Sequence, residues 1–188
     1  GDIEFEVGPV SFVQISLEGA GVLVDEVRKR AGQNLGRVVD VYGGAGMFAL
    51  ALAERATSVS LVEQPGPSAD DAARNLAGVG RVFAEDAGQI DGVLKEADTV
   101  IVDPPRSGLA KSVVEALMHR STVRRVIYVS CSPETLVRDV ERLTKGGFIP
   151  HSFTPVDLFP HTPHVEVVTH LTRESRARAA CDGMEWTG

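Results

Sequence analysis

Apolar residues repeat along this chain in an alternating strand and helix rhythm. Short runs rich in Val, Ile and Leu fall at 37–42, 57–62, 80–84, 98–103, 124–130 and 164–171. Stretches with helical spacing of apolar residues fall between them, at 46–55, 67–77, 109–119 and 133–144. Several strands are apolar on both faces, which is typical of a parallel sheet with helices on each side. The pattern predicts an α/β fold.

Four segments depart from this rhythm. Residues 2–7 alternate acidic and apolar side chains, which predicts a short lead-in strand. Helical spacing from Ser16 to Arg30 predicts a helix that stops near Gly32. The stretch 146–163 holds four prolines, so we expect turns there that fold over the active edge of the sheet. Residues 174–188 have no strand pattern and are expected to form a frayed or disordered tail, leaving one domain over 1–173.

Composition narrows the class of protein. The chain has 188 residues, 43% hydrophobic and 24% charged, which suits one globular domain. Its apolar runs are too short to cross a bilayer and its first residues lack a signal-peptide pattern, so we expect a cytoplasmic protein without a membrane partner. Two cysteines exclude a disulfide framework or a four-cysteine metal site, and we expect no metal. The net charge of −7 argues against a domain that grips nucleic acid by itself.

A glycine-rich turn joins a strand to a helix at 38–49, in V-V-D-V-Y-G-G-A-G-M-F-A. Glycines let the backbone approach a nucleoside and place helix-start N–H groups beside it. Gly44, Gly46 and Ala49 also satisfy the loose dinucleotide pattern, so a nicotinamide or flavin nucleotide stays open. A tight turn without a ligand is a further alternative.

Acidic residues follow the next two strands. Glu63 ends the strand some twenty residues beyond the glycine turn, where a carboxylate can accept hydrogen bonds from both ribose hydroxyls. Asp86 follows the third strand and could bind an adenine amino group, with Glu85 as the alternative. Either carboxylate could instead face water.

Two motifs carry the candidate chemistry. The strand ending at Asp103 continues as D-P-P-R-S-G-L, in which two prolines stiffen the exit and hold Asp103 in place. The next strand delivers Cys131 in S-C-S-P, directly before a helix. A helix start stabilises a thiolate, so we expect a lowered pKa and a nucleophilic Cys131. The alternative is a buried, inert cysteine.

Five motifs together resemble the RNA (uracil-5-)-methyltransferases. They are F-V-Q at 12–14, D-V-Y-G-G-A-G-M-F at 40–48, D-P-P-R-S-G at 103–108, Y-V-S-C-S-P-E-T-L-V-R-D at 128–139 and L-F-P-H-T-P-H-V-E at 158–166. The resemblance spans about residues 5–172. It implies a class I, Rossmann-like methyltransferase fold, with a mostly parallel seven-stranded sheet and S-adenosyl-L-methionine at its edge.

The resemblance also implies roles for single residues. Cys131 matches the nucleophile that adds to uracil carbon 6, and Glu166 matches the base that removes the proton of carbon 5. The positions that match cofactor contacts are Gln14, Tyr42, Glu63, Asp86 and Asp103. Gly44 is a further cofactor-binding candidate from the glycine-rich turn. His161 and His164 are alternative bases, although neither stands at the family's position.

Three positions depart from the family pattern. Gly43 replaces a usual Cys, Ser132 replaces a usual Asn, and Met47 replaces a polar residue that commonly meets the cofactor. Met47 offers only a thioether there.

The resemblance implies an enzyme that forms 5-methyluridine in transfer or ribosomal RNA. Phe153 and Phe159 are candidate walls for a flipped base, and Arg106 could meet RNA phosphate or form a surface ion pair. The alternatives are a methyltransferase for another base or a small molecule, and a cofactor-binding module without activity. We expect a monomer that is the catalytic part, residues 1–173, of a longer protein whose N-terminal domains grip the RNA.

Overall fold

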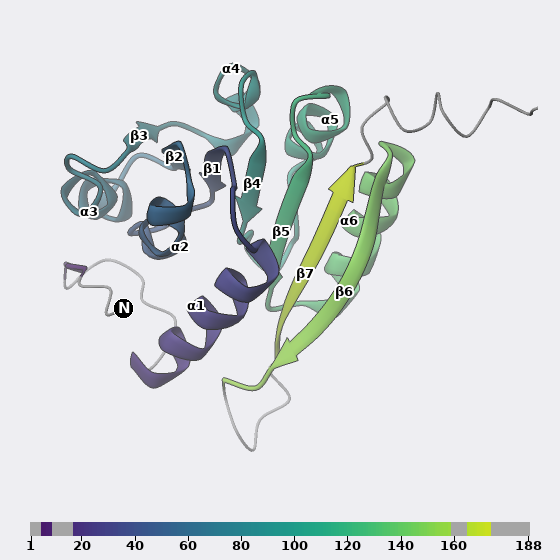
Figure 1. The fold of residues 1–188 in the computed structure, drawn as a ribbon, viewed down its shortest axis with the longest axis horizontal. Helices are drawn as coiled ribbons and strands as arrows, with labels where there is room; N and C mark the ends of the chain where they lie inside the picture. The colour runs from purple at the N-terminus through teal and green to yellow at the C-terminus, as the bar shows by residue number, and fades with distance from the viewer. Residues whose placement is uncertain (1–4, 9–16, 159–164, 174–188) are drawn as a thin grey trace, which may run out of the picture.

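The structure is a computed structural model that describes residues 5–8, 17–158 and 165–173. Its centre is a seven-stranded sheet flanked by helices on both faces (Figure 1). The strands are β1 Arg37–Val41, β2 Ser58–Glu63, β3 Arg81–Ala84, β4 Thr99–Val102, β5 Arg125–Ser130, β6 Phe148–Val156 and β7 Glu166–Arg173. The helices are α1 Leu17–Ala31, α2 Met47–Leu52, α3 Pro67–Asn75, α4 Asp91–Leu94, α5 Lys111–His119 and α6 Pro133–Lys145, with 3₁₀ turns at Ala53–Arg55 and Ala87–Gln89.

The strand order is β3-β2-β1-β4-β5-β7-β6, in which β1 to β5 are parallel and β7 runs antiparallel to both neighbours. The chain leaves β1 toward β2 on one side and returns to β4 on the other. Open α/β sheets bind ligands at such a switch point, beyond the carboxyl ends of the strands. We call that side, where β1 to β5 end, the carboxyl edge, and the opposite side the amino edge.

Two apolar layers cover the sheet. One layer packs α4, α5 and α6 on the face that includes Val100, Val126 and Tyr128. The other packs α1, α2 and α3 on the face that includes Ile101 and Ile127. The alternation along β4 and β5 places successive side chains on opposite faces, which is why both strands are apolar throughout. The predicted α/β class, the helices and six of the strands are confirmed, with ends shifted by one or two residues.

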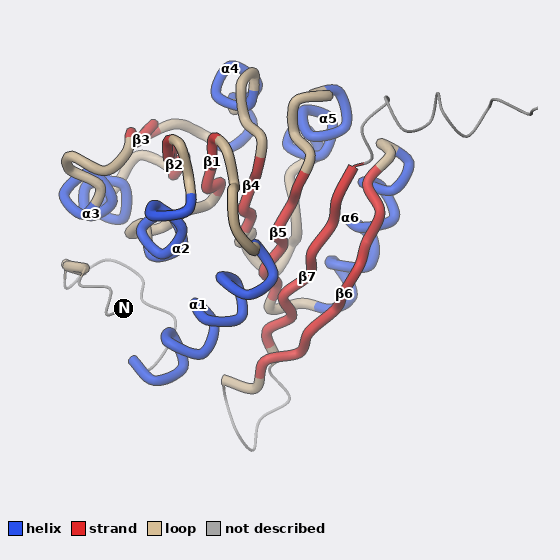
Figure 2. The backbone as a smooth tube through the Cα atoms, viewed as in Figure 1, coloured by secondary structure: helices blue, strands red, loops and turns tan. Residues whose placement is uncertain are grey.

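Two predictions of local structure are wrong. The described part of the expected lead-in strand 2–7, residues 5–7, forms no strand. The stretch expected to form turns after Gly146 instead contains β6, which runs beside β7 (Figure 2). Pro150 and Pro155 are tolerated because β6 pairs only with β7 among the described strands, and its register shifts between Pro150 and Ser152. The predicted tail 174–188 lies outside the described residues.

Candidate active site

The turn after β1 is held against β2 by backbone hydrogen bonds. Tyr42 and Gly43 both donate their N–H groups to the carbonyl of Val62, at 3.0 and 3.2 Å. Gly44 donates its N–H to the Glu63 carboxylate at 2.9 Å. Tyr42 and Gly44 have φ values of 63° and 53°, and nothing lies within 4 Å of where a Gly44 Cβ would stand. The backbone at Gly44 is therefore open to a neighbouring molecule.

Asp40 lies beneath this turn and is completely buried. One of its carboxylate oxygens accepts a hydrogen bond from the Ala49 N–H at 2.9 Å, and the other has no partner among the described residues. Burial raises the pKa of Asp40 to about 7, against the Ala49 hydrogen bond and with help from the nearby Glu63 charge. The turn therefore rests on a carboxyl group that titrates near neutral pH.

A cavity of about 610 Å³ opens beside the turn, at the carboxyl edge. Four of the predicted cofactor residues and the predicted nucleophile line it. Its walls include Tyr42, Gly44, Glu63, Asp103, Arg106 and Cys131, together with Phe5, Met47, Gln64 and Ser68. A cavity of this size suits a small-molecule ligand of nucleoside dimensions.

Cys131 directly follows β5 and precedes α6, and it is partly exposed. Its backbone is braced by Ser130, whose hydroxyl donates to the Ser132 carbonyl and accepts from the Ser132 N–H, both at 3.1 Å. The thiol is thus presented to the cavity from a fixed turn rather than from a mobile loop.

The expectation of a lowered Cys131 pKa is wrong. Burial raises the pKa of Cys131, and the Glu166 and Asp103 charges add to it, against its own backbone N–H and Arg106. The start of α6 supplies few donors to a thiolate, because Ser130 occupies the Ser132 N–H and Pro133 has none. Burial of the thiol and the nearby carboxylates therefore outweigh the helix start.

Glu166 begins β7 and is 3% exposed, so it does not stand on the solvent side of its strand. Burial raises its pKa to about 7, partly opposed by the positive charge of Arg106. Asp103 follows β4, and burial raises its pKa well above the usual range, with the Glu166 and Asp40 charges adding to the effect. Since β4, β5 and β7 are adjacent, three strand ends bring Asp103, Cys131 and Glu166 together.

Asp86 lies apart from this group. It lines a second cavity of about 340 Å³ that shares Tyr42, Gln64 and Pro105 with the first. Its carboxylate accepts a hydrogen bond from the Gly88 N–H at 2.7 Å and caps the 3₁₀ turn Ala87–Gln89. A ligand in the first cavity can thus contact Asp86 only if it extends into the second cavity.

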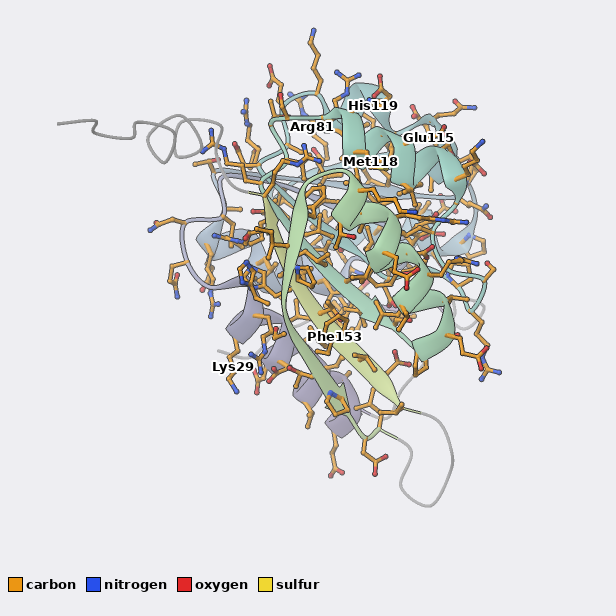
Figure 3. All side chains as sticks on the ribbon, turned by 90° about the vertical axis from the view of Figure 1, so that its right-hand side faces the viewer. Lys29, Arg81, Glu115, Met118, His119 and Phe153 are labelled. Carbon is orange, nitrogen blue, oxygen red and sulfur yellow. The ribbon has the colours of Figure 1, made fainter. Side chains whose placement is uncertain are left out.

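Several candidates lie elsewhere. Gln14, Phe159, His161 and His164 fall outside the described residues. Phe153 is 52% exposed on β6 and is not among the described residues that line either cavity (Figure 3). The sequence reasoning missed Asp40, Gln64 and Ser68. The position of Gln64 directly after the strand-end Glu63 is the one signal that could have found it.

The comparisons with known proteins agree with this geometry. The model of the tRNA (uracil-5-)-methyltransferase family matches residues 81–174, half of the chain. An uncharacterized RNA methyltransferase of Bacillus cereus is 38% identical over 184 residues, covering 92% of this chain and 39% of that protein. The chain belongs to the tRNA (uracil-5-)-methyltransferase family.

Comparison with solved structures identifies the fold of the chain. The tRNA (uracil-54, C5)-methyltransferase of Pyrococcus abyssi, in complex with S-adenosyl-L-homocysteine, superposes with a TM-score of 0.79 at 34% identity. That match covers 91% of this chain and 42% of the Pyrococcus chain. A ribosomal protein L11 methylase of Lactobacillus delbrueckii, with a TM-score of 0.66 at 17% identity, shares the fold alone. The predicted class I methyltransferase fold is confirmed.

The chain spans about two fifths of the length of the curated family members it matches. None of the helices in the described ranges is long and apolar enough to cross a lipid bilayer. Within the same ranges, no three His, Cys, Asp or Glu side chains gather as metal ligands would.

The structure explains one departure from the family pattern. A Cβ at Gly43 would stand 2.5 Å from the Leu61 side chain, so a larger residue at 43 would require Leu61 to move. Met47 lines the first cavity, where its side chain offers no hydrogen-bond donor. Nothing in the structure explains Ser132 in place of Asn.

Proposed function

We propose that this chain is the catalytic part of an S-adenosyl-L-methionine-dependent enzyme that converts uridine to 5-methyluridine in RNA, with Cys131 as nucleophile and Glu166 as base. The observation that carries the proposal is the convergence of Cys131, Asp103 and Glu166 from three adjacent strand ends, where Cys131 and Asp103 line the first cavity and the Glu166 charge acts on the Cys131 thiol. The family match and the Pyrococcus structure, named as a tRNA (uracil-54, C5)-methyltransferase, support this substrate class.

The residues around the first cavity fit the cofactor. Tyr42, Gly44, Glu63 and Asp103 would hold it, with Asp86 reached through the second cavity and Gln14 proposed from the family motif alone. When bound, S-adenosyl-L-methionine supplies an electrophilic methyl group on a positively charged sulfur. Two observations fit such a cation: an open backbone at Gly44, and carboxylates at 40, 63, 103 and 166 that form no ion pair with the described residues. A positive charge would favour the ionised forms of these acids.

Cys131 would begin the reaction. Its thiol loses a proton to solvent, and the thiolate sulfur forms a bond to carbon 6 of uracil while the electrons of the carbon 5–carbon 6 double bond move onto the carbonyl oxygen at carbon 4. The enolate makes carbon 5 nucleophilic toward the electrophilic methyl group that the bound cofactor would supply. Without the thiol addition, carbon 5 of uracil is too weak a nucleophile for this transfer.

Glu166 would complete the reaction. Its carboxylate takes the remaining proton from carbon 5, the double bond forms again, and the carbon 6–sulfur bond breaks to release the Cys131 thiolate. A general base works best when its pKa lies near the working pH, and the pKa of Glu166 is about 7. The burial of Glu166 therefore suits the role of a base better than that of a surface charge.

The rest of the protein would supply the grip on RNA. The net charge of −7 is poor for phosphate binding, and the chain spans 39% of its Bacillus relative. We therefore assign catalysis to residues 1–173 and most of the RNA affinity to domains outside this chain, in a cytoplasmic, monomeric protein.

Trapping of the covalent adduct tests the proposal. The full-length protein is mixed with S-adenosyl-L-methionine and RNA that contains 5-fluorouridine, and the products are analysed by mass spectrometry. Because fluorine at carbon 5 cannot leave as a proton, the adduct on the peptide containing Cys131 should persist. Asp98→Asn, at the amino edge, is the matched control and should trap normally. Absence of the adduct, or its formation by Cys131→Ala, would refute the proposal.

A further inference from the structure

Asp139 is a buried carboxylate that the proposed reaction does not use. It lies on α6 and is completely inaccessible to solvent. One oxygen accepts hydrogen bonds from the Leu109 N–H at 2.7 Å and from the Tyr128 hydroxyl at 3.0 Å. The other accepts from Arg138 at 3.0 Å and from Arg142 at 3.4 Å. A buried charge with this many donors from separate segments ties those segments together.

The segment bound by Asp139 is the one that follows Asp103 into the cavity wall. Two more side chains of α6 hold it: Thr135 donates to the Arg106 carbonyl at 3.2 Å, and Arg138 donates to the Ser107 carbonyl at 2.8 Å. The approach is so close that a Cβ on Gly108, whose φ is 79°, would overlap the Asp139 carboxylate. A Cβ there would overlap the Arg138 guanidinium as well, so the Gly108 backbone lies directly against two side chains of α6.

The far end of the same segment meets the turn after β1. The Ala110 N–H donates to the Tyr42 hydroxyl at 3.2 Å. Residues 104–110 are thus held by hydrogen bonds to α6 and, at their end, to Tyr42. The first three residues of this segment, Pro104, Pro105 and Arg106, line the first cavity.

Cys131 lies in the short connection between β5 and α6, two residues before the first residue of the helix, Pro133. One helix therefore sets both walls of the cavity at this point. We propose that Asp139 is a positioning residue, which clamps the 104–109 segment to α6 and so holds Arg106 at a fixed place opposite Cys131. The inference rests on the proposed role of Cys131 as nucleophile and deepens it.

The clamp has a consequence for the thiol that a purely structural role would lack. Burial and the charges of Glu166 and Asp103 raise the pKa of Cys131, and Arg106 is the side chain that opposes them. Arg106 is exposed, and only its backbone carbonyl is bonded to α6, so release of the segment lets its side chain move farther from the thiol and its effect is screened. Loss of Asp139 should therefore make the thiol less acidic even in a folded protein.

The test measures alkylation of Cys131 by iodoacetamide against pH, in the full-length protein without RNA or cofactor. The modified peptide that contains Cys131 is followed by mass spectrometry, so that Cys181 does not interfere. In Asp139→Ala we expect the midpoint of the profile to move up by about half a pH unit, and the rate near neutral pH to fall about threefold. Asp139→Asn keeps an acceptor for the Leu109 N–H and should give an intermediate shift.

Asp98→Asn is the matched control. Like Asp139, Asp98 accepts hydrogen bonds from a backbone N–H and from an arginine side chain, both of Arg37. A Cβ on Gly36 would collide with Asp98, as a Cβ on Gly108 would with Asp139. Asp98 differs in lying at the amino edge. Its alkylation profile should match that of the wild type. If Asp139→Ala does not fold, Thr135→Val, which removes the bonds of the Thr135 hydroxyl to the Arg106 and Ser132 carbonyls, each at 3.2 Å, should shift the profile in the same direction by a smaller amount.

Turnover gives a second readout. Single-turnover methylation by Asp139→Asn should slow about tenfold or more, while the affinity for S-adenosyl-L-homocysteine changes less than about twofold. An unchanged alkylation profile in folded Asp139 and Thr135 variants would overturn the inference, whatever their thermal stability. Failure of wild-type adduct trapping would instead refute the proposed function, since the alkylation assay requires neither RNA nor methyl transfer.

Discussion

Carboxylates at the two edges of the central sheet have pKa values shifted in opposite directions. At the amino edge, Asp98 accepts hydrogen bonds from the backbone N–H of Arg37 at 2.9 Å and from its guanidinium at 3.1 Å. Although burial acts against it, these bonds and the charge of Arg37 hold the pKa of Asp98 below its usual range. At the carboxyl edge, burial raises the pKa values of Asp40 and Glu166 to about 7.

The contrast separates carboxylates that stabilise the fold from those that are available for chemistry. An ionised acid with an arginine partner contributes to stability at neutral pH, whereas a buried acid without one costs stability there. A protein retains the second kind where a ligand or a reaction needs it, and strongly shifted pKa values cluster at such places. Four experiments can break or sharpen this comparison.

The largest effect is expected from Glu166→Gln. The amide cannot take the proton from carbon 5, so turnover should fall about 10²- to 10⁴-fold. Ordinary uridine RNA should then accumulate as a methylated adduct on Cys131, visible by denaturing electrophoresis and mass spectrometry. The equivalent change at the amino edge, Asp98→Asn, should leave turnover within about twofold. Turnover that survives in Glu166→Gln would remove Glu166 from the mechanism.

The next effect is on stability, through Asp40. The native state keeps the Asp40 proton up to about pH 7, while the unfolded chain releases it near its ordinary value of 3.8. The native state thus binds more protons in that window, and the contribution of Asp40 to stability falls as pH rises from 4 to 7.

Asp40→Asn removes this loss and keeps an acceptor for the Ala49 N–H. The free energy of unfolding of the variant minus that of the wild type should be about 2–3 kcal/mol higher at about pH 8 than at about pH 5, which means that the variant is relatively more stable at the higher pH. Urea unfolding at the two pH values measures the difference. A variant that is equally destabilised at both would show that Asp40 is ionised throughout.

The pH dependence of methylation is a smaller test of the same edge. Both Glu166 and Cys131 must lose a proton, and the pKa values of both are raised by burial. The rate should therefore increase about a hundredfold per pH unit below about pH 7, where both groups titrate, and about tenfold per pH unit above it, where only the thiol still titrates. In Glu166→Gln the inflection near neutral pH should disappear. A rate that is already level below about pH 6 would contradict the raised values.

The smallest effect is expected on the free energy of unfolding, from the substitution Asp98→Asn. Its side chain is 38% exposed, so solvent screens the ion pair with Arg37 and the loss should be at most about 1 kcal/mol. The stabilisation by Asp98 is present above the unfolded pKa of 3.8 and disappears as pH falls through the lower native value. Thermal unfolding at about pH 7 and about pH 3 should show the variant and the wild type converging at the acidic pH. A larger loss at the acidic pH would contradict this.

Much of the fold follows from local patterns. Continuous apolar runs identify β1, β4 and β5 as buried on both faces, and glycines and prolines mark the turns around them. The same rules failed for β6, because its prolines are forbidden only in a strand with two neighbours, and the sequence alone does not show that β6 lies at an edge.

The candidate site divides in the same way. Tyr42, Gly44, Glu63, Asp103 and Cys131 were predicted from motifs that end strands, and the structure brings them to one cavity. Asp40 was missed because it looks like any residue of a buried strand until its unpartnered oxygen is seen.

The sequence by itself determined which groups could react, since a thiol before a helix and acids at strand ends are local features. Only the tertiary structure decided how acidic they are. The Cys131 thiol was expected to be more acidic than usual from the helix start alone. The pKa is raised instead, because the fold buries the thiol and the ends of β4 and β7 bring two carboxylates near it. Acidity depends on burial and on charges that are distant in sequence, and folding determines both.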